Sequence, residues 1–291
     1  MLRLTVRRSL HPAADLGALR AMTARIDERY GWVEPGMRRT AQRVAGVPAE
    51  WIDVAGSRPD RVVLYLHGGA FVFRFPQLHA GLAARICTRV AARALVVDYR
   101  LAPEHPHPAA GDDCLAAYRA LRADGVPAAG IVLIGDSAGG NLVLATLHRL
   151  KAAGEPLPAC AVAMSPVVDF TLSSESLVGN AARDPIFTLG AMLGFRRLYA
   201  APEAFLDPSV SPLFGDWAGL PPLLFQVGST EMLRDEAVRA AERARAAGTP
   251  VELEIYDRAP HVFQAMRRLP QSEVALDSLA RFVGRHAGWH G

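Results

Sequence analysis

The sequence predicts an α/β protein whose core is a doubly wound, mostly parallel sheet. Short apolar runs alternate along the chain with stretches of helical periodicity. Several of these runs are apolar at every position, as strands covered on both faces require. One of them leads directly into Gly135-Asp136-Ser137-Ala138-Gly139, a serine held between small residues where a strand would end and a helix begin.

Six strands and several helices follow from the pattern. The strands are expected at residues 62–66, 94–97, 131–134, 161–164, 223–227 and 251–255, and the last one alternates as an edge strand would. Between them, Leu78, Leu82, Ile86 and Val90 form an apolar stripe at a spacing of four. Further helices are expected around residues 115–122, after Ser137, and over residues 236–247 and 272–286.

Two segments interrupt the alternation. Residues 1–47 have apolar positions at helical spacing and no expected strand, and residues 170–205 form a second helical stretch between two strands. Because so long an insertion between consecutive strands often forms a lid, we interpret the two segments together as a small helical cap. Residues 48–169 and 206–291 then form the main domain. Alternatively, each segment packs on the flank of the sheet.

Composition narrows the class of protein. With 291 residues, 51% of them hydrophobic, the chain can bury a sizeable core. The net charge is +3, but the basic residues are scattered among acids, which argues against a nucleic-acid partner. Cys87, Cys114 and Cys160 lie far apart in apolar or Ala-rich segments, so we expect small buried thiols and a reducing compartment, the cytoplasm. The chain has no apolar run long enough for a transmembrane helix, and residues 1–10 lack the apolar core and cleavage site of a secretory signal, so we expect no such signal here.

The glycine-flanked serine predicts nucleophilic catalysis. An elbow serine needs amide donors for an oxyanion, and then, in chain order, an acid and a histidine. His67-Gly68-Gly69-Ala70 follows the first expected strand and leaves backbone amides uncovered, and Ala138 supplies the amide next to Ser137. These positions predict an oxyanion loop in front of the serine.

The acid and the base are expected after the last two strands. Three carboxylates compete for the first role: Glu231, nearest the strand end, and Asp235 and Glu236, which begin the next helix. Acids are common in a first helical turn because of the helix dipole, so we favour Glu231. His261 is the histidine that follows the last strand, and it is the expected base.

In this order the motifs resemble those of the hormone-sensitive-lipase-like esterases, the bacterial family IV type of the α/β-hydrolase superfamily. The resemblance runs from about Val47 to the end. It is carried by the blocks 67–70, 98–104 (Asp-Tyr-Arg-Leu-Ala-Pro-Glu), 135–140, 228–236 and 261–263. The resemblance implies an α/β-hydrolase fold with a small helical cap. It also implies the following roles: Ser137 as nucleophile, His261 as base, Glu231 as acid, and Gly68, Gly69 and Ala138 as oxyanion donors.

The resemblance also implies the activity. We expect a serine carboxylesterase for short- to medium-chain acyl esters that works through an acyl-enzyme and needs no cofactor. Its partner is a small-molecule ester, with no nucleic acid and no stable membrane insertion, and a homodimer is left open. Ala70 replaces a third glycine of the family and is expected to narrow the alcohol side of the pocket. The expected pocket residues are Ala70, Phe71, Phe187, Met192 and Phe195.

Other interpretations of the same motifs stay open. An amidase, deacetylase or lactonase would use the same triad. A receptor on this scaffold, like the gibberellin receptor of plants, would lack the catalytic histidine, so His261 favours an enzyme. Glu104-His105-Pro106-His107-Pro108 has metal-ligand residue types, but the family carries this segment as a turn, so no metal is expected.

Overall fold

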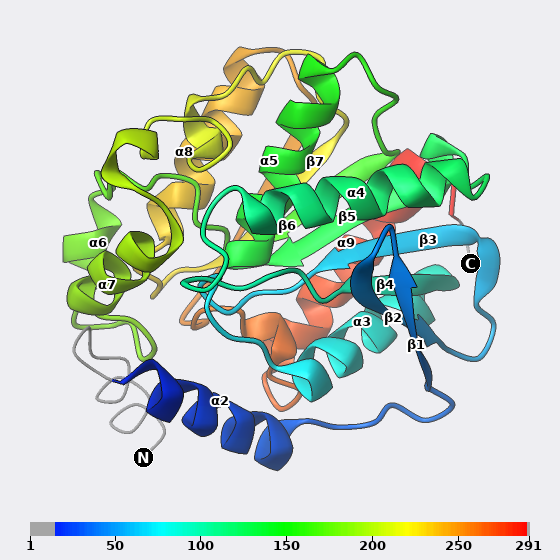
Figure 1. Ribbon diagram of the computed structural model, residues 1–291, viewed down its shortest axis with the longest axis horizontal. Helices are drawn as coiled ribbons and strands as arrows, with labels where there is room; N and C mark the ends of the chain where they lie inside the picture. The colour runs from blue at the N-terminus through cyan, green and yellow to red at the C-terminus, as the bar shows by residue number, and fades with distance from the viewer. Residues whose placement is uncertain (1–14, 290–291) are drawn as a thin grey trace.

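A single eight-stranded sheet organises the chain. The structure, a computed structural model, describes residues 15–289 (Figure 1). The strands are β1 (Arg38–Val44), β2 (Val47–Asp53), β3 (Arg58–Leu66), β4 (Ala92–Val97), β5 (Ile131–Asp136), β6 (Cys160–Met164), β7 (Leu223–Gly228) and β8 (Val251–Tyr256). Their order in the sheet is β1-β2-β4-β3-β5-β6-β7-β8. From β4 to β8 all neighbours are parallel, which confirms the mostly parallel sheet and places β8 at an edge.

Helices cover both faces of the sheet (Figure 1). The longer ones are α2 (Leu16–Tyr30), α3 (Pro76–Val90), α4 (Ala109–Ala123), α5 (Ala138–Ala152), α7 (Leu189–Tyr199), α8 (Arg234–Ala246) and α9 (Pro270–Ala287). α4, α5 and α8 pack on one face, and α3 and α9 pack together on the other. No helix among residues 15–289 is both long and apolar enough to cross a membrane.

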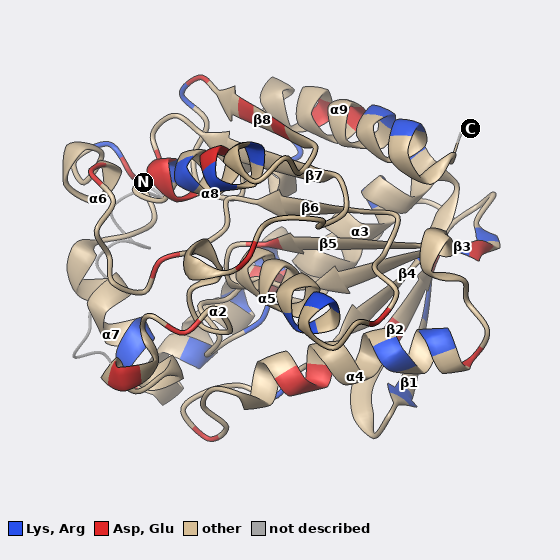
Figure 2. Ribbon diagram, turned by 90° about the horizontal axis from the view of Figure 1, so that it is seen from above, with Lys and Arg blue, Asp and Glu red and all other residues tan. Residues whose placement is uncertain are grey.

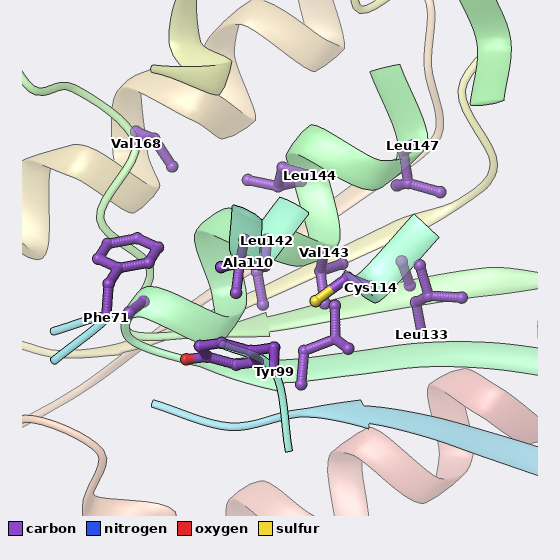
Figure 3. Close-up of a cluster of buried hydrophobic side chains, with 14 of the residues drawn as sticks. Phe71, Tyr99, Ala110, Cys114, Leu133, Leu142, Val143, Leu144, Leu147 and Val168 are labelled. Carbon is purple, nitrogen blue, oxygen red and sulfur yellow. The ribbon is translucent and has the colours of Figure 1, made fainter. Parts of the chain in front are cut away.

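The two faces of the sheet bury two separate apolar clusters. Leu133 of β5 belongs to the cluster under α4 and α5, while its neighbours Val132 and Ile134 belong to the cluster under α3 and α9. Figure 3 shows Cys114 among the apolar side chains of the first cluster. All three cysteines are buried and free, which confirms that they act as small core residues.

The expectation that residues 1–47 contain no strand was wrong. Residues 38–44 form β1, which pairs with β2 in an antiparallel hairpin. Most of β1 is exposed at the edge of the sheet, so it lacks the apolar pattern by which strands were predicted. Ala45 and Gly46 both have positive φ, 50° and 80°, as a two-residue hairpin turn requires. The helical half of the expectation is confirmed by α2, and residues 1–14 lie outside the described residues.

The inserted segment between β6 and β7 is helical, as expected, and holds α6 (Ser176–Gly179) and α7. It is tied to the loop that follows β7. Asn180 Nδ2 donates to the carbonyl oxygens of Ser229 and Glu231, at 3.1 and 2.8 Å. The amide of Met232 donates to the buried Asp184 carboxylate at 2.8 Å. The insertion is therefore fastened to the segment in which the catalytic acid was expected.

The outer helices carry charged residues of both signs: they are interspersed along α8, and on α9 the acids precede the arginines (Figure 2). Many are matched in ion pairs, such as Arg285 with Glu252 and Arg149 with Asp112. The small positive net charge is thus spread over a surface of mixed sign.

Candidate active site

Ser137 lies in a strained turn between β5 and α5. Its φ of 52° and ψ of −117° belong to a region that non-glycine residues rarely occupy. The turn needs small neighbours: a Cβ on Gly139 would overlap the carbonyl oxygen of Leu66, and one on Gly135 would overlap the backbone of Gly139. The two glycines of the motif are therefore steric requirements, and the strain presents the serine side chain beyond the end of the strand.

Ser137, His261 and Glu231 form one continuous hydrogen-bonded chain. Ser137 Oγ lies 2.9 Å from His261 Nε2, and His261 Nδ1 lies 2.7 Å from Glu231 Oε2. All three side chains are buried, and Glu231 has no solvent exposure. The three residues come from the ends of β5, β7 and β8, although up to 124 positions of sequence separate them.

The charge of Glu231 governs the protonation of His261. Burial alone lowers the pKa of His261, because it disfavours the imidazolium ion. The hydrogen bond and the negative charge of Glu231 outweigh that effect, and the net result is a pKa above its ordinary value. The pair thus stabilises a proton on the imidazole, as a base that receives a proton from serine requires.

The second oxygen of Glu231 is held by two donors. Glu231 Oε1 accepts from Ser165 Oγ at 2.8 Å and from the amide of Gly228 at 2.5 Å. The amide of Val262, next to His261, donates to Ser165 Oγ at 3.2 Å. Ser165 therefore connects the acid loop with the histidine loop. The sequence analysis missed it, although its position directly after β6 is equivalent to that of Ser137 after β5.

The two competing carboxylates have other partners. Asp235 accepts from the amide of Ser176 at 2.8 Å. Glu236 is fully buried and accepts from the amide of Val168 and from Ser174 Oγ, at 2.9 and 3.0 Å. Both carboxylates bind the inserted segment or the residues that lead into it, and neither hydrogen-bonds to His261.

The oxyanion loop differs from the expectation at Gly68. The amide of Gly68 donates to Asp136 Oδ1 at 3.0 Å, and Asp136 also accepts from Tyr65 Oη at 2.7 Å. The Gly68 amide is therefore occupied, and it is not a free oxyanion donor. Within residues 15–289, the amides of Gly69, Ala70 and Ala138 have no intramolecular acceptor. The donor set that the structure leaves free is Gly69, Ala70 and Ala138.

The oxyanion loop adopts left-handed backbone at consecutive positions. Gly69 has a φ of +123°, and a Cβ at this position would overlap the carbonyl oxygen of Phe73. Ala70 and Phe71 have φ values of 52° and 63°, which are costly for residues with a Cβ. Asp136 beneath Gly68 and the stacking of Phe71 on Tyr199, with ring centroids 3.7 Å apart, hold this conformation.

A small apolar pocket lies beside Ser137. Its volume is about 50 Å³, space for roughly three to five water-sized groups. The walls include all five of the expected pocket residues, Ala70, Phe71, Phe187, Met192 and Phe195, and also Val167, Phe170, Leu172, Arg196 and Leu233. A larger groove of about 620 Å³ lies between α2 and the loops near Phe73 and Glu104, but no triad residue lines it. The smaller pocket is therefore the candidate substrate site.

Known proteins match the chain over nearly its whole length. A family model described as alpha/beta hydrolase fold matches residues 63–265. An acetyl-hydrolase from Streptomyces hygroscopicus is 38% identical over 267 residues, 91% of this chain and 88% of that protein. An esterase from Acinetobacter venetianus is 38% identical over 243 residues, 83% of this chain and 80% of that protein.

Solved structures agree with these relatives. The crystal structure of an esterase from the bacterial hormone-sensitive lipase family superposes with a TM-score of 0.93 at 38% identity, over 99% of this chain and 97% of that one. The chain belongs to the α/β-hydrolase fold family, among its hormone-sensitive-lipase-like esterases, and is a carboxylic ester hydrolase.

Proposed function

We propose that the protein hydrolyses short- to medium-chain acyl esters through a Ser137-His261-Glu231 triad and an acyl-enzyme intermediate. The observation that carries the proposal is the unbroken chain of hydrogen bonds from Ser137 Oγ through His261 to the buried Glu231 carboxylate. A receptor on the same scaffold would not need these hydrogen bonds, because a receptor releases its ligand chemically unchanged.

The first half of the reaction makes the acyl-enzyme. Neutral His261 takes the proton of Ser137 Oγ at Nε2 while Oγ bonds to the ester carbonyl carbon. The carbonyl oxygen becomes an oxyanion and accepts hydrogen bonds from the free amides of Gly69, Ala70 and Ala138. The carbon–oxygen bond to the alcohol then breaks, and His261 gives its proton to the leaving oxygen.

The second half releases the acid. Water loses a proton to His261 Nε2 as its oxygen bonds to the acyl carbon. The resulting oxyanion uses the same amides, and its collapse breaks the bond to Ser137 Oγ, which regains the proton from His261. Glu231 orients the imidazole through the hydrogen bond to Nδ1 and stabilises the imidazolium ion.

Two features support a preference for short acyl groups. The pocket has room for only a few heavy atoms, and part of its wall comes from α7 of the inserted segment through Met192 and Phe195.

The same contacts support the division of the chain into two parts. We assign residues 170–205 and α2 to a cap, and the other described residues to the catalytic domain.

A stopped-flow assay with p-nitrophenyl acetate, butyrate and decanoate tests the proposal. We expect a burst of nitrophenol equal to the enzyme concentration, an acyl group on Ser137 in acid-quenched enzyme by mass spectrometry, and the highest kcat/KM for acetate or butyrate. Ser137→Ala should abolish all three signals and leave the circular dichroism spectrum unchanged. An S137A variant that keeps a tenth of the activity would refute the assignment of the nucleophile.

We also propose a cytoplasmic location, because all three cysteines are free and buried. Fractionation of cells that express the protein tests this. Recovery of the protein mainly outside the cytoplasm would contradict it.

A further inference from the structure

Arg196 is the one charged side chain among the described residues that line the pocket beside Ser137. It lies on α7, one helical turn after Met192 and directly after Phe195. The other walls are apolar apart from Ser137 itself. Arg196 is half-buried, and a positive charge against apolar walls is less well solvated than in water unless it is paired, so its partners decide what it does.

The protein satisfies only one edge of this guanidinium. Nη1 donates to the carbonyl oxygen of Phe170 at 2.8 Å and more weakly to that of Thr171 at 3.5 Å. The guanidinium carbon lies 4.7 Å from the centre of the Phe205 ring. Nε is buried and has no hydrogen-bond partner, and Nη2 makes no hydrogen bond within residues 15–289. Nη2 is therefore the accessible donor that the protein leaves unused, while Nε is enclosed by protein atoms.

No carboxylate neutralises Arg196. Within residues 15–289 it forms no ion pair, and residues 1–14 contain neither aspartate nor glutamate. Asp169, which precedes Phe170, is committed elsewhere: it binds Arg239 Nη1 at 2.6 Å and the hydroxyls of Thr171 and Ser173. Burial lowers the pKa of Arg196, but an arginine remains charged at neutral pH.

The unused donor has a defined chemical complement. Nη2 carries N–H groups of a permanently charged guanidinium, and a carboxylate oxygen accepts a short, charge-assisted hydrogen bond from such a donor. We propose that Arg196 makes the pocket selective for esters that carry a carboxylate a few bonds from the ester carbonyl, bound at Nη2. The inference rests on the proposed function and adds a substrate class to it.

Two sources of that carboxylate fit the same chemistry. It is either on the acyl side, in a monoester of a dicarboxylic acid, or on the alcohol side, in an acylated hydroxy acid. Monomethyl succinate and O-acetylglycolate are the anionic probes for these two cases. Methyl 4-methylpentanoate and isobutyl acetate are their neutral counterparts of similar shape.

The experiment measures kcat/KM for the four esters in a pH-stat and compares the anionic-to-neutral ratio within each pair. In the wild type we expect at least one anionic ester to be hydrolysed as efficiently as its neutral counterpart. Arg196→Gln should lower that ratio by about tenfold or more, because a charge-assisted hydrogen bond is lost. Arg196→Lys keeps the charge but not the donor at the position of Nη2, so its ratio should lie between the two.

Arg197 supplies the matched control. It follows Arg196 on α7, has the same charge, is exposed and does not line the pocket. Arg197→Gln should keep the wild-type ratio. An equal fall in R197Q would mean that overall charge, rather than the pocket, sets the ratio, and this would overturn the proposal. So would an unchanged ratio in both pairs for R196Q, or a wild type that disfavours both anionic esters more than tenfold.

Failure of this inference is separable from failure of the proposed function. If the wild type shows no activity above S137A on p-nitrophenyl acetate, the triad assignment fails. If it hydrolyses the neutral esters but the ratios do not depend on residue 196, only the role of Arg196 fails. Should R196Q not fold, as judged by its melting curve, the R196K and wild-type ratios decide: an R196K ratio within twofold of wild type in both pairs overturns the proposal.

Discussion

Glu231→Gln should nearly abolish esterase activity for a reason visible in the hydrogen bonds. The Oε1 position of Glu231 faces two donors, Ser165 Oγ and the Gly228 amide, at 2.8 and 2.5 Å. The amide of a glutamine has one acceptor oxygen, and that oxygen must stay where the fixed Gly228 donor points. The NH₂ group is then left facing His261 Nδ1.

An NH₂ group at that position reverses the roles of the imidazole nitrogens. It would donate to Nδ1, so the proton of neutral His261 would move to Nε2, which faces Ser137 Oγ at 2.9 Å. A protonated Nε2 cannot accept the serine proton. The same tautomer effect costs about 10⁴-fold in kcat in serine proteases, and we expect a loss of about 10³- to 10⁴-fold here.

Asp235→Asn is the matched control, since it also turns an acid into an amide four residues away. Asp235 binds the Ser176 amide at 2.8 Å and lies outside the triad, so we expect less than a threefold loss. Both variants are assayed for kcat and KM with p-nitrophenyl butyrate, with melting temperatures recorded alongside. A D235N loss equal to that of E231Q, or an E231Q enzyme with a tenth of wild-type kcat, would refute the tautomer reasoning.

Three further predictions follow from the site and the core. Because the pKa of His261 is raised and only its neutral form is a base, kcat/KM should rise with pH, and the midpoint of the rise should lie above about pH 6.5. A value of kcat/KM that is constant from pH 5 to 8 would contradict this prediction. Phe195→Ala or Met192→Ala should raise the C10-to-C4 ratio of kcat/KM, by about fourfold for each newly buried methylene, and unchanged ratios in both would place these side chains off the acyl path. Burial raises the pKa of Glu236 to about 7 from 4.5, so the folded protein holds this proton more tightly than the unfolded chain does. The free energy of unfolding should therefore fall as pH rises from about 5 to 8, because the unfolded chain loses the proton first. Glu236→Gln should remove up to about 3 kcal/mol of that pH dependence, measured by urea unfolding at pH 5 and 8, and equal slopes for both proteins would argue against it.

The residues that could be predicted from the sequence lie directly after parallel strands. In such a sheet the carboxyl ends of all parallel strands meet at one edge. A glycine-flanked serine after β5, an acid after β7 and a histidine after β8 must then converge there, even across 124 positions. Strand order and residue type indicated which loops would meet, and the choice of Glu231 among three acids rested also on the resemblance to the esterase family.

The edge hairpin and the Gly68 contact could not be predicted in that way. β1 is exposed along most of its length, so pairing with β2, rather than burial, defines it as a strand. Gly68 looked like an oxyanion donor because a glycine leaves its amide uncovered. That inference ignored Asp136, which is next to Ser137 in the sequence but points under the loop and takes the Gly68 amide. A local sequence motif shows which backbone amides are not shielded by a side chain of the same residue. It cannot show which of these amides already donate a hydrogen bond to another part of the fold.

Catalysis and selectivity depend on different kinds of sequence information in this protein. The proposed triad lies at strand ends that the sheet brings together, and the turn that holds Ser137 is enforced by tight packing around Gly135 and Gly139. Half of the residues that line the pocket come from the insertion, which is tied to the Glu231 loop by long-range hydrogen bonds such as that from Asn180 to the Glu231 carbonyl oxygen. A substitution on α7 can therefore change which ester fits while the hydrogen bond between Ser137 and His261 stays intact, because within residues 15–289 no residue of α7 hydrogen-bonds to Ser137, Glu231 or His261. Arg196 is a charge that the insertion brings to an otherwise apolar pocket, and its contribution is for that reason expected in the choice of substrate and not in the chemistry of the triad.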